Sequence, residues 1–98
     1  MKSQKFENVW DALAETPEEA INLTFRSDLM SSIEKVVESW NITQADAAKR
    51  LGLTRPRLND LMRGKLSKFS LDALTTLATR AGLKVQLSVK KAQVKKAA

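Results

Sequence analysis

The chain has 98 residues, which is enough for one small hydrophobic core. It contains no cysteine and no histidine, which excludes disulfides and metal sites built from thiolates or imidazoles. The same absence removes the side chains that most often act as nucleophile or general base. No apolar run approaches ~18 residues, so we expect no membrane span, and the composition indicates neither an enzyme nor a cofactor. The net charge of +6 divides into −4 for residues 1–41 and +5 for each of residues 42–68 and 69–98, which predicts an acidic surface and a basic one suited to a polyanion.

The first predicted element is a short amphipathic helix near residues 6–14, within an N-terminal segment that we bound at residues 1–15. Its apolar side chains recur at helical spacing: Phe6, Val9, Trp10 and Leu13. This stripe has two interpretations, because it either covers the domain's own core or binds a partner protein. The acidic residues Glu7, Asp11, Glu15, Glu18 and Glu19 favour a basic partner.

A long helix is predicted from Pro17 to Ser39, closed by Trp40, and it opens a main domain that we bound at residues 16–82. Thr16 is the predicted N-cap, and a proline suits the first helical position. One stripe of this helix is apolar and is expected to face the core: Ile21, Phe25, Leu29, Ile33, Val36, Val37 and Trp40.

Two short helices with a tight turn between them are predicted, from Gln44 to Leu51 and from Thr54, as N-cap, to about Arg63. Gly52 supplies the left-handed residue that the turn requires. The positions expected to face the core are small or apolar: Ala47, Ala48, Leu51, Leu53, Leu58 and Leu61. This pattern predicts a helix-turn-helix, whose second helix enters a major groove of DNA.

A loop over residues 65–68 leads to a last helix, which Ser70 caps and which runs to Ala81 before Gly82. Phe69 and Leu74 flank this cap at the spacing of a hydrophobic staple. The predicted fold is therefore an all-α bundle of about five helices.

Residues 83–90 alternate apolar and polar side chains, which predicts one short C-terminal strand. Its apolar members are the predicted dimerisation residues: Leu83, Val85, Leu87 and Val89. A lone strand cannot satisfy its backbone groups, so it pairs with its own copy in a homodimer or with the sheet edge of a partner protein. Residues 91–98 are expected to form a flexible basic tail.

The predicted DNA-binding residues are polar side chains in and after the helix-turn-helix: Gln44, Thr54, Arg55, Arg57, Asn59, Arg63, Lys65 and Lys68. Arg55 and Arg57 are expected to read bases or clamp phosphates. Asn59 reads adenine, touches the DNA backbone or is merely solvated, and Gln44 either binds a phosphate or only helps to start its helix. The remaining cations are expected to contact the DNA backbone and to set affinity rather than sequence preference.

The segment from Thr43 to Gly64 resembles the helix-turn-helix of the phage-repressor (Cro/XRE) class, and the likeness extends over roughly residues 25–81. The wider sequence is similar to HigA-type antitoxins in residues 7–13, 16–20, 47–54, 61–65 and 69–74, and in the final strand expected after Gly82. This resemblance implies a lambda-repressor-like fold, a homodimer, repression of its own operon through a double-stranded DNA operator, and inhibition of a RelE/HigB-like ribonuclease toxin. Pro56 departs from the polar residue common at that place in repressors and puts the operator sequence in doubt.

Two alternatives remain open. The first is a standalone phage-type repressor without a toxin. The second is a protein-interaction module whose helix-turn-helix no longer touches DNA, against which the outward residues Arg55, Arg57 and Arg63 count. The basic N-terminus is not followed by an apolar segment, so we expect no secretory signal and a cytoplasmic, nucleoid-associated protein.

Overall fold

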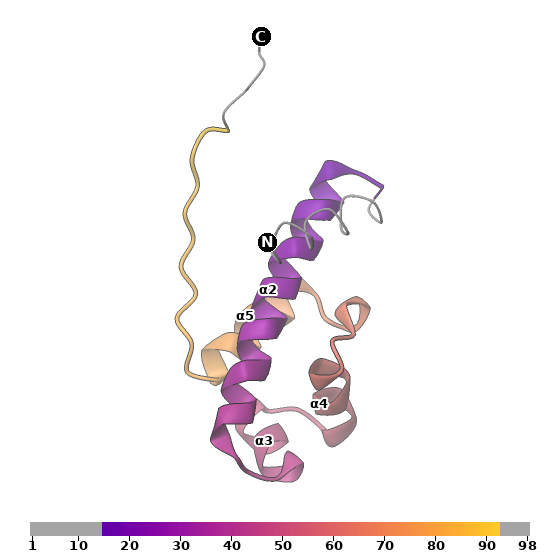
Figure 1. Cartoon of the computed structure of the whole chain (residues 1–98), viewed down its shortest axis with the longest axis vertical. Helices are drawn as coiled ribbons and strands as arrows, with labels where there is room; N and C mark the ends of the chain where they lie inside the picture. The colour runs from indigo at the N-terminus through magenta and orange to yellow at the C-terminus, as the bar shows by residue number, and fades with distance from the viewer. Residues whose placement is uncertain (1–14, 93–98) are drawn as a thin grey trace.

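The computed structural model describes residues 15–92, and this part of the chain is all-helical. Figure 1 shows its elements in order: α2 (Pro17–Trp40), α3 (Gln44–Leu51), α4 (Arg55–Met62), the 3-10 turn η1 (Leu66–Lys68) and α5 (Leu71–Arg80). The predicted loop at residues 65–68 thus contains a 3-10 turn. The helix predicted near residues 6–14, with Phe6, Val9, Trp10 and Leu13, lies outside the described residues. Within residues 15–92 the four α-helices expected there are present, and the fifth predicted helix is the one that lies outside them.

The bounds of α2 follow from its two ends. The hydroxyl oxygen of Thr16 accepts a hydrogen bond from the Glu19 N–H at 3.1 Å, and Pro17 occupies the first turn. At the other end Asn41 has a φ of 53°, the left-handed conformation that stops a helix and that asparagine tolerates better than most residues. The predicted start and end of this helix are confirmed.

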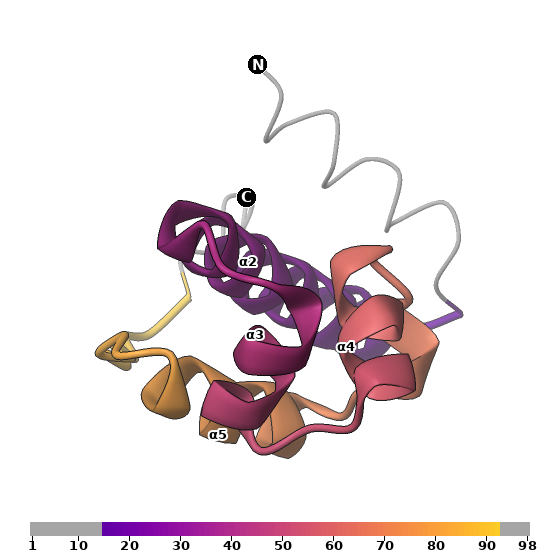
Figure 2. The ribbon, with the colours of Figure 1, turned by 90° about the horizontal axis from the view of Figure 1, so that it is seen from below.

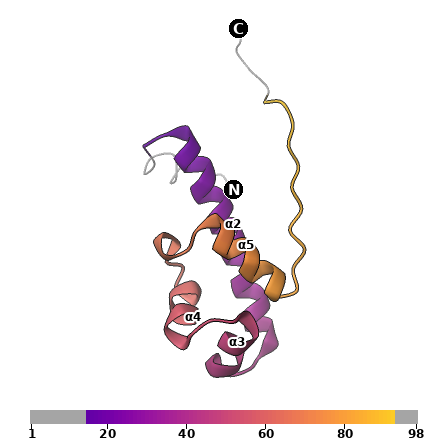
Figure 3. The same cartoon turned by 180° about the vertical axis from the view of Figure 1, so that it is seen from behind.

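α4, η1 and α5 pack on α2. α5 lies against α2, and α3 packs between α4 and α5 (Figures 2 and 3). One core forms where these helices meet: Met30, Ile33, Val37, Ala47, Ala48, Leu51, Leu58, Leu61, Phe69, Leu74, Leu77, Ala78 and Ala81. The core positions predicted for the helix-turn-helix are confirmed, although Leu53 is only half-buried.

The predicted apolar stripe of α2 was wrong at its N-terminal end. Ile21 and Phe25 are 55% and 50% exposed, whereas Met30, which was not assigned to the stripe, is 2% exposed. The physical reason is helical drift, because residues four apart are displaced by about 40° around a helix of 3.6 residues per turn. A row that starts at Ile21 therefore winds off the face that carries Ile33.

The strand predicted at residues 83–90 is not formed, and residues 83–92 have no regular secondary structure. In Figure 1 this segment runs alone in an extended course beside the helices. A strand is defined by backbone pairing, and the described chain offers this segment no second strand. Leu83 packs against the core, but Leu87 and Val89 are 83% and 82% exposed.

Candidate nucleic-acid interface

Gly52 forms the turn between α3 and α4. Its φ of 69° is left-handed, its N–H donates to the carbonyl oxygen of Lys49 at 3.1 Å, and the N–H of Leu53 donates to that of Ala48 at 2.8 Å. This pair of hydrogen bonds is the Schellman motif, which closes a helix and reverses the chain at a glycine. The helix-turn-helix predicted from the sequence is therefore present, and Figure 2 shows α3 and α4 next to each other.

Arg80, at the end of α5, secures this turn from outside the motif. Its Nη1 donates to the carbonyl oxygen of Leu51, the last residue of α3, at 3.0 Å. A cation at a helix C-terminus also interacts favourably with the helix dipole. Sequence reasoning missed this role, because the two residues are 29 positions apart and an arginine in the last turn of a helix usually signals only local capping.

The outward face of α4 presents Arg55, Asn59 and Arg63, which follow one another at intervals of four residues. All three are exposed, and they lie at the beginning, the middle and the end of the helix. Thr54 precedes them as the N-cap, since its hydroxyl oxygen accepts a hydrogen bond from the Arg57 N–H at 3.3 Å. A short rigid helix thus carries two guanidinium groups and an amide toward solvent.

Gln44 is exposed at the first position of α3, as predicted, and the hydroxyl of Thr43 caps this helix by accepting from the Asp46 N–H at 3.1 Å. The N-termini of α3 and α4 are therefore both capped by threonine hydroxyls. Free N–H groups and the positive end of the dipole make a helix N-terminus a favourable place for a phosphate.

Arg57 differs from the other predicted DNA-binding residues, because its side chain is turned back against the protein. Its Nη1 donates to the carbonyl oxygen of Lys68 at 2.8 Å, and its guanidinium carbon lies 4.1 Å from the centre of the Phe69 ring. The side chain is half-buried. The structure therefore brings Arg57 to the junction of α4 and η1, and not to the row formed by Arg55, Asn59 and Arg63.

The two lysines of the η1 region are exposed beside the end of α4. Lys65 forms an ion pair with Asp60, with Nζ 3.5 Å from Oδ1, and its N–H donates to the carbonyl oxygen of the same residue at 3.1 Å. An ion pair whose lysine side chain is 43% exposed is weak, so this ammonium group can still turn to a phosphate. Lys68 ends η1.

Two further cations lie in the last turn of α3. Lys49 and Arg50 are both exposed, and the guanidinium carbon of Arg50 lies 4.8 Å from the centre of the Trp40 ring. A guanidinium over an indole face is a favourable cation–π contact. Arg50 is thus directed toward the end of α2.

Burial raises the pKa of Glu34 above its ordinary value, and the charge of Glu38 one turn later adds to this shift. The Glu34 carboxylate is 4.0 Å from the position that a Cβ on Gly64 would occupy. A partly desolvated acid therefore lies behind the C-terminal end of α4. Among residues 15–92 there is no cluster of three side chains suited to a metal ion, and no helix there is long and apolar enough to cross a membrane.

Known proteins give two findings that agree with this geometry. Residues 12–90 match the model of the family described as "Helix-turn-helix domain". A solved structure named as an XRE family transcriptional regulator is similar, with 28% sequence identity, a TM-score of 0.70, and coverage of 79% of this chain and 86% of that one. No curated protein matches the chain. The matched residues span most of the sequence, and the chain therefore belongs to the helix-turn-helix domain family.

Proposed function

We propose that the protein is a sequence-specific DNA-binding regulator of the XRE type that binds a double-stranded operator with α4 in the major groove. The observation that carries this proposal is the outward row of Arg55, Asn59 and Arg63 on a helix whose start is fixed by the Gly52 turn. Arg55 and Asn59 are the members of this row that we expect to read bases, because arginine and asparagine often read guanine and adenine edges. Arg63, at the end of the row, is expected to contact the DNA backbone. The family match and the likeness to an XRE family regulator support the same function.

The surroundings of α4 suit the DNA backbone. Lys65 and Lys68 follow the helix, and Gln44 begins the preceding one. Residues 42–68 carry a net charge of +5, which favours phosphate binding through counterion release. We assign these three side chains to phosphate contacts, which position the protein without reading sequence.

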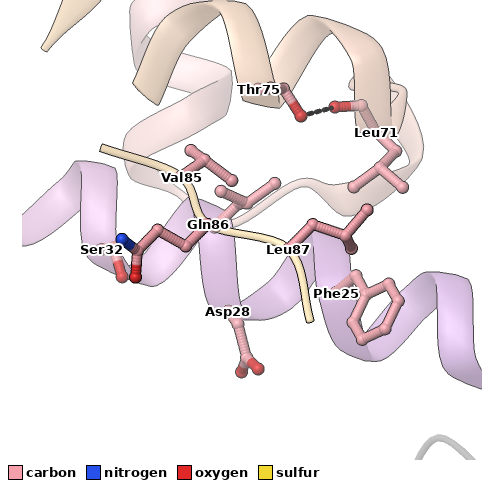
Figure 4. A pocket seen from close by; sticks show the side chains of 9 residues that line it. Phe25, Asp28, Ser32, Leu71, Thr75, Val85, Gln86 and Leu87 are labelled. Atoms are coloured by element: carbon pink, nitrogen blue, oxygen red, sulfur yellow. Dashed lines mark hydrogen bonds between the residues drawn. The ribbon is translucent and has the colours of Figure 1, made fainter. Parts of the chain in front are cut away.

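The dimer is proposed to form through residues 83–89. Val85 and Leu87 line a pocket of about 310 Å³ with Phe25, Leu29 and Leu71, and Figure 4 shows Leu87 and Phe25 on the same side of it. Most of these apolar side chains are exposed in the single chain. Pairing with the same segment of a second copy gives the backbone of residues 83–89 its hydrogen bonds and covers this surface. A two-fold dimer then places two copies of α4 about one helical turn of DNA apart.

An antitoxin role is the finer part of the proposal: the protein represses its own operon and neutralises a RelE/HigB-like ribonuclease toxin. The sequence supports it with an apolar stripe in an acidic segment: Phe6, Val9, Trp10 and Leu13. A neighbouring reading frame of ~90–120 residues, a size suited to one small domain, is the candidate toxin gene. Its expression alone is expected to stop growth, and co-expression of this chain is expected to restore it. Growth unaffected by that frame favours a standalone repressor.

The first experiment is a mobility shift on the protein's own promoter region and on a scrambled duplex, at ~150 mM salt where nonspecific binding is weak. We expect binding to the promoter at concentrations at which the scrambled duplex stays free. Equal, weak binding to both duplexes would contradict operator recognition and would leave a protein-interaction role for the helix-turn-helix.

A further inference from the structure

The turn that follows α4 is held by two arginine side chains from different helices. We call residues 65–69 the basic turn. Arg26 of α2 donates from Nη1 to the carbonyl oxygens of Leu66 at 2.9 Å and Phe69 at 3.2 Å. Arg57 of α4 donates to the carbonyl oxygen of Lys68 at 2.8 Å. Three backbone carbonyls of one five-residue turn are therefore satisfied by guanidinium groups.

The two arginines are themselves fixed in place. Nε of Arg26 donates to Oδ1 of Asn22, one helical turn earlier, at 2.7 Å. The guanidinium of Arg57 stacks on Phe69, whose ring is buried in the core. A planar group that donates a hydrogen bond and stacks on a ring at once is held in one orientation, which an ammonium group cannot reproduce. We call the contacts of Arg26 and Arg57 with the basic turn the clamp. Through Phe69 the clamp is connected to the core.

The opposite end of the basic turn is also tied to α4. Lys65 reaches Asp60 through both its backbone N–H and its ammonium group. Together with the contact from Arg57 to Lys68, this means that α4 holds both the first and the fourth residue of the basic turn. Lys65 and Lys68, the two cations proposed to meet phosphates, are thus the residues whose backbones α4 fixes.

We propose that Arg57 is a positioning residue, which together with Arg26 fixes the basic turn so that Lys65 and Lys68 meet the DNA backbone beside α4. This inference rests on the proposed DNA-binding function. It replaces the expectation that Arg57 reads bases, because its guanidinium already stacks on Phe69 and donates to Lys68. Loss of Arg57 therefore weakens binding to every duplex alike and acts through Lys68.

The test is a double-mutant cycle on DNA with Arg57→Gln, Lys68→Gln and the double variant, and with Arg55→Gln as the matched control on the same helix. Dissociation constants are measured on operator and scrambled duplexes over a range of salt concentrations. We expect Arg57→Gln to weaken both duplexes by the same factor and to reduce the salt slope by about one, the value of one lost phosphate contact. Adding Lys68→Gln to it is expected to change little further. Arg57→Lys is expected to behave like Arg57→Gln, because lysine lacks the planar fork.

Two outcomes on DNA would overturn the proposal. One is a loss of discrimination between operator and scrambled duplex in Arg57→Gln of ~5-fold or more, the size expected for a lost base contact. The other is additive losses for Arg57→Gln and Lys68→Gln, because independent contacts add. Arg55→Gln, in contrast, is expected to reduce discrimination.

Amide hydrogen exchange in the free protein separates this inference from the proposed function. The N–H groups of Lys68 and Phe69 donate within the basic turn, to the carbonyl oxygens of Lys65 at 3.0 Å and Leu66 at 3.2 Å. We expect Arg57→Gln to speed exchange at these two amides and to leave the amides of α2 and α5 protected, whereas Arg55→Gln leaves all of them unchanged. Unchanged exchange at both amides would show that the positioning role is wrong even if operator binding is selective. A wild-type protein without operator preference would show instead that the proposed function is wrong. The role of Arg57 in DNA binding would then be wrong as well.

Discussion

A methyl group placed on Gly52 would lie 2.6 Å from Nη1 of Arg80, a distance that Cβ atoms do not tolerate. The turn of the helix-turn-helix is therefore shaped by two constraints at one residue, a left-handed φ and the close approach of a side chain from α5. Both act on the link between α3 and α4.

Gly52→Ala is expected to lower the free energy of unfolding by about 1–3 kcal/mol, because the left-handed conformation strains any side chain and Arg80 must also move. Urea denaturation measures the change. Gly82→Ala is the matched control, since Gly82 has a φ of 88° and nothing within 4 Å of its Cβ position. A loss at Gly52 no larger than at Gly82 would contradict the contribution of Arg80.

Arg80→Ala removes the hydrogen bond to the Leu51 carbonyl and is expected to cost about 1 kcal/mol of unfolding free energy. This is less than a buried charged donor contributes, because Arg80 is exposed. In this background, Gly52→Ala should cost about as much as Gly82→Ala. Thermal or urea unfolding of the four variants checks this coupling. Strictly additive losses would show that the side chain and the glycine act independently.

Arg55→Ala is expected to weaken operator binding by about 1–3 kcal/mol and to relax sequence preference, because a lost bidentate base contact costs that much. Lys68→Ala is expected to weaken all duplexes alike and to flatten the salt dependence. Competition binding with operator and scrambled duplexes distinguishes the two. Retained discrimination in Arg55→Ala, or a sequence-selective loss in Lys68→Ala, would contradict the assignments.

Glu34→Gln is expected to stabilise the protein near pH 7. Burial and the charge of Glu38 raise the pKa of Glu34 in the folded chain, so the folded state holds this proton more tightly than the unfolded state. The contribution of Glu34 is therefore most favourable below its unfolded-state pKa, and it falls as the pH rises from there through the raised folded pKa. Urea unfolding at several pH values should show this fall in wild type and a smaller one in Glu34→Gln. An identical pH dependence would show that Glu34 is not its source.

The double substitution Leu87→Lys and Val89→Lys is expected to make the protein monomeric, because charges at two exposed apolar positions oppose burial against a second copy. Sedimentation equilibrium measures the change. Ser88→Lys is the control, since it adds a charge on the opposite side of the alternating pattern. A dimer that persists in the double variant would place the interface elsewhere.

Local signals in the sequence were enough to predict the four α-helices of residues 15–92 and, to within a residue or so, their ends. Thr54 and Ser70 cap the helices that they were expected to cap, and Gly52 reverses the chain as its position indicated. Capping depends on atoms three residues apart, which is why a single sequence reveals it. The helix-turn-helix, and with it the location of the candidate site, follows from such signals.

Long-range contacts could not be predicted in the same way. Arg57 and Arg55 look alike in the sequence, but one stacks on Phe69 and the other faces solvent. Two positions apart, they lie on different faces of the helix. No local signal shows that the face of Arg57 meets Phe69 and Lys68, because these lie 11 or more positions further along the chain. The strand failed for a related reason, since alternation predicts an extended segment but not a partner for its backbone.

The clamp from Arg57 to the basic turn bears on efforts to change which operator the protein recognises. Redesign by exchanging the solvent-facing residues of a recognition helix assumes that each of its basic residues is free to vary. On α4 that freedom extends to Arg55, Asn59 and Arg63, and an exchange that included Arg57 would also release Lys68. A chimera that keeps Arg57 should retain affinity while its preference changes, so this arginine belongs to the scaffold that a designer keeps.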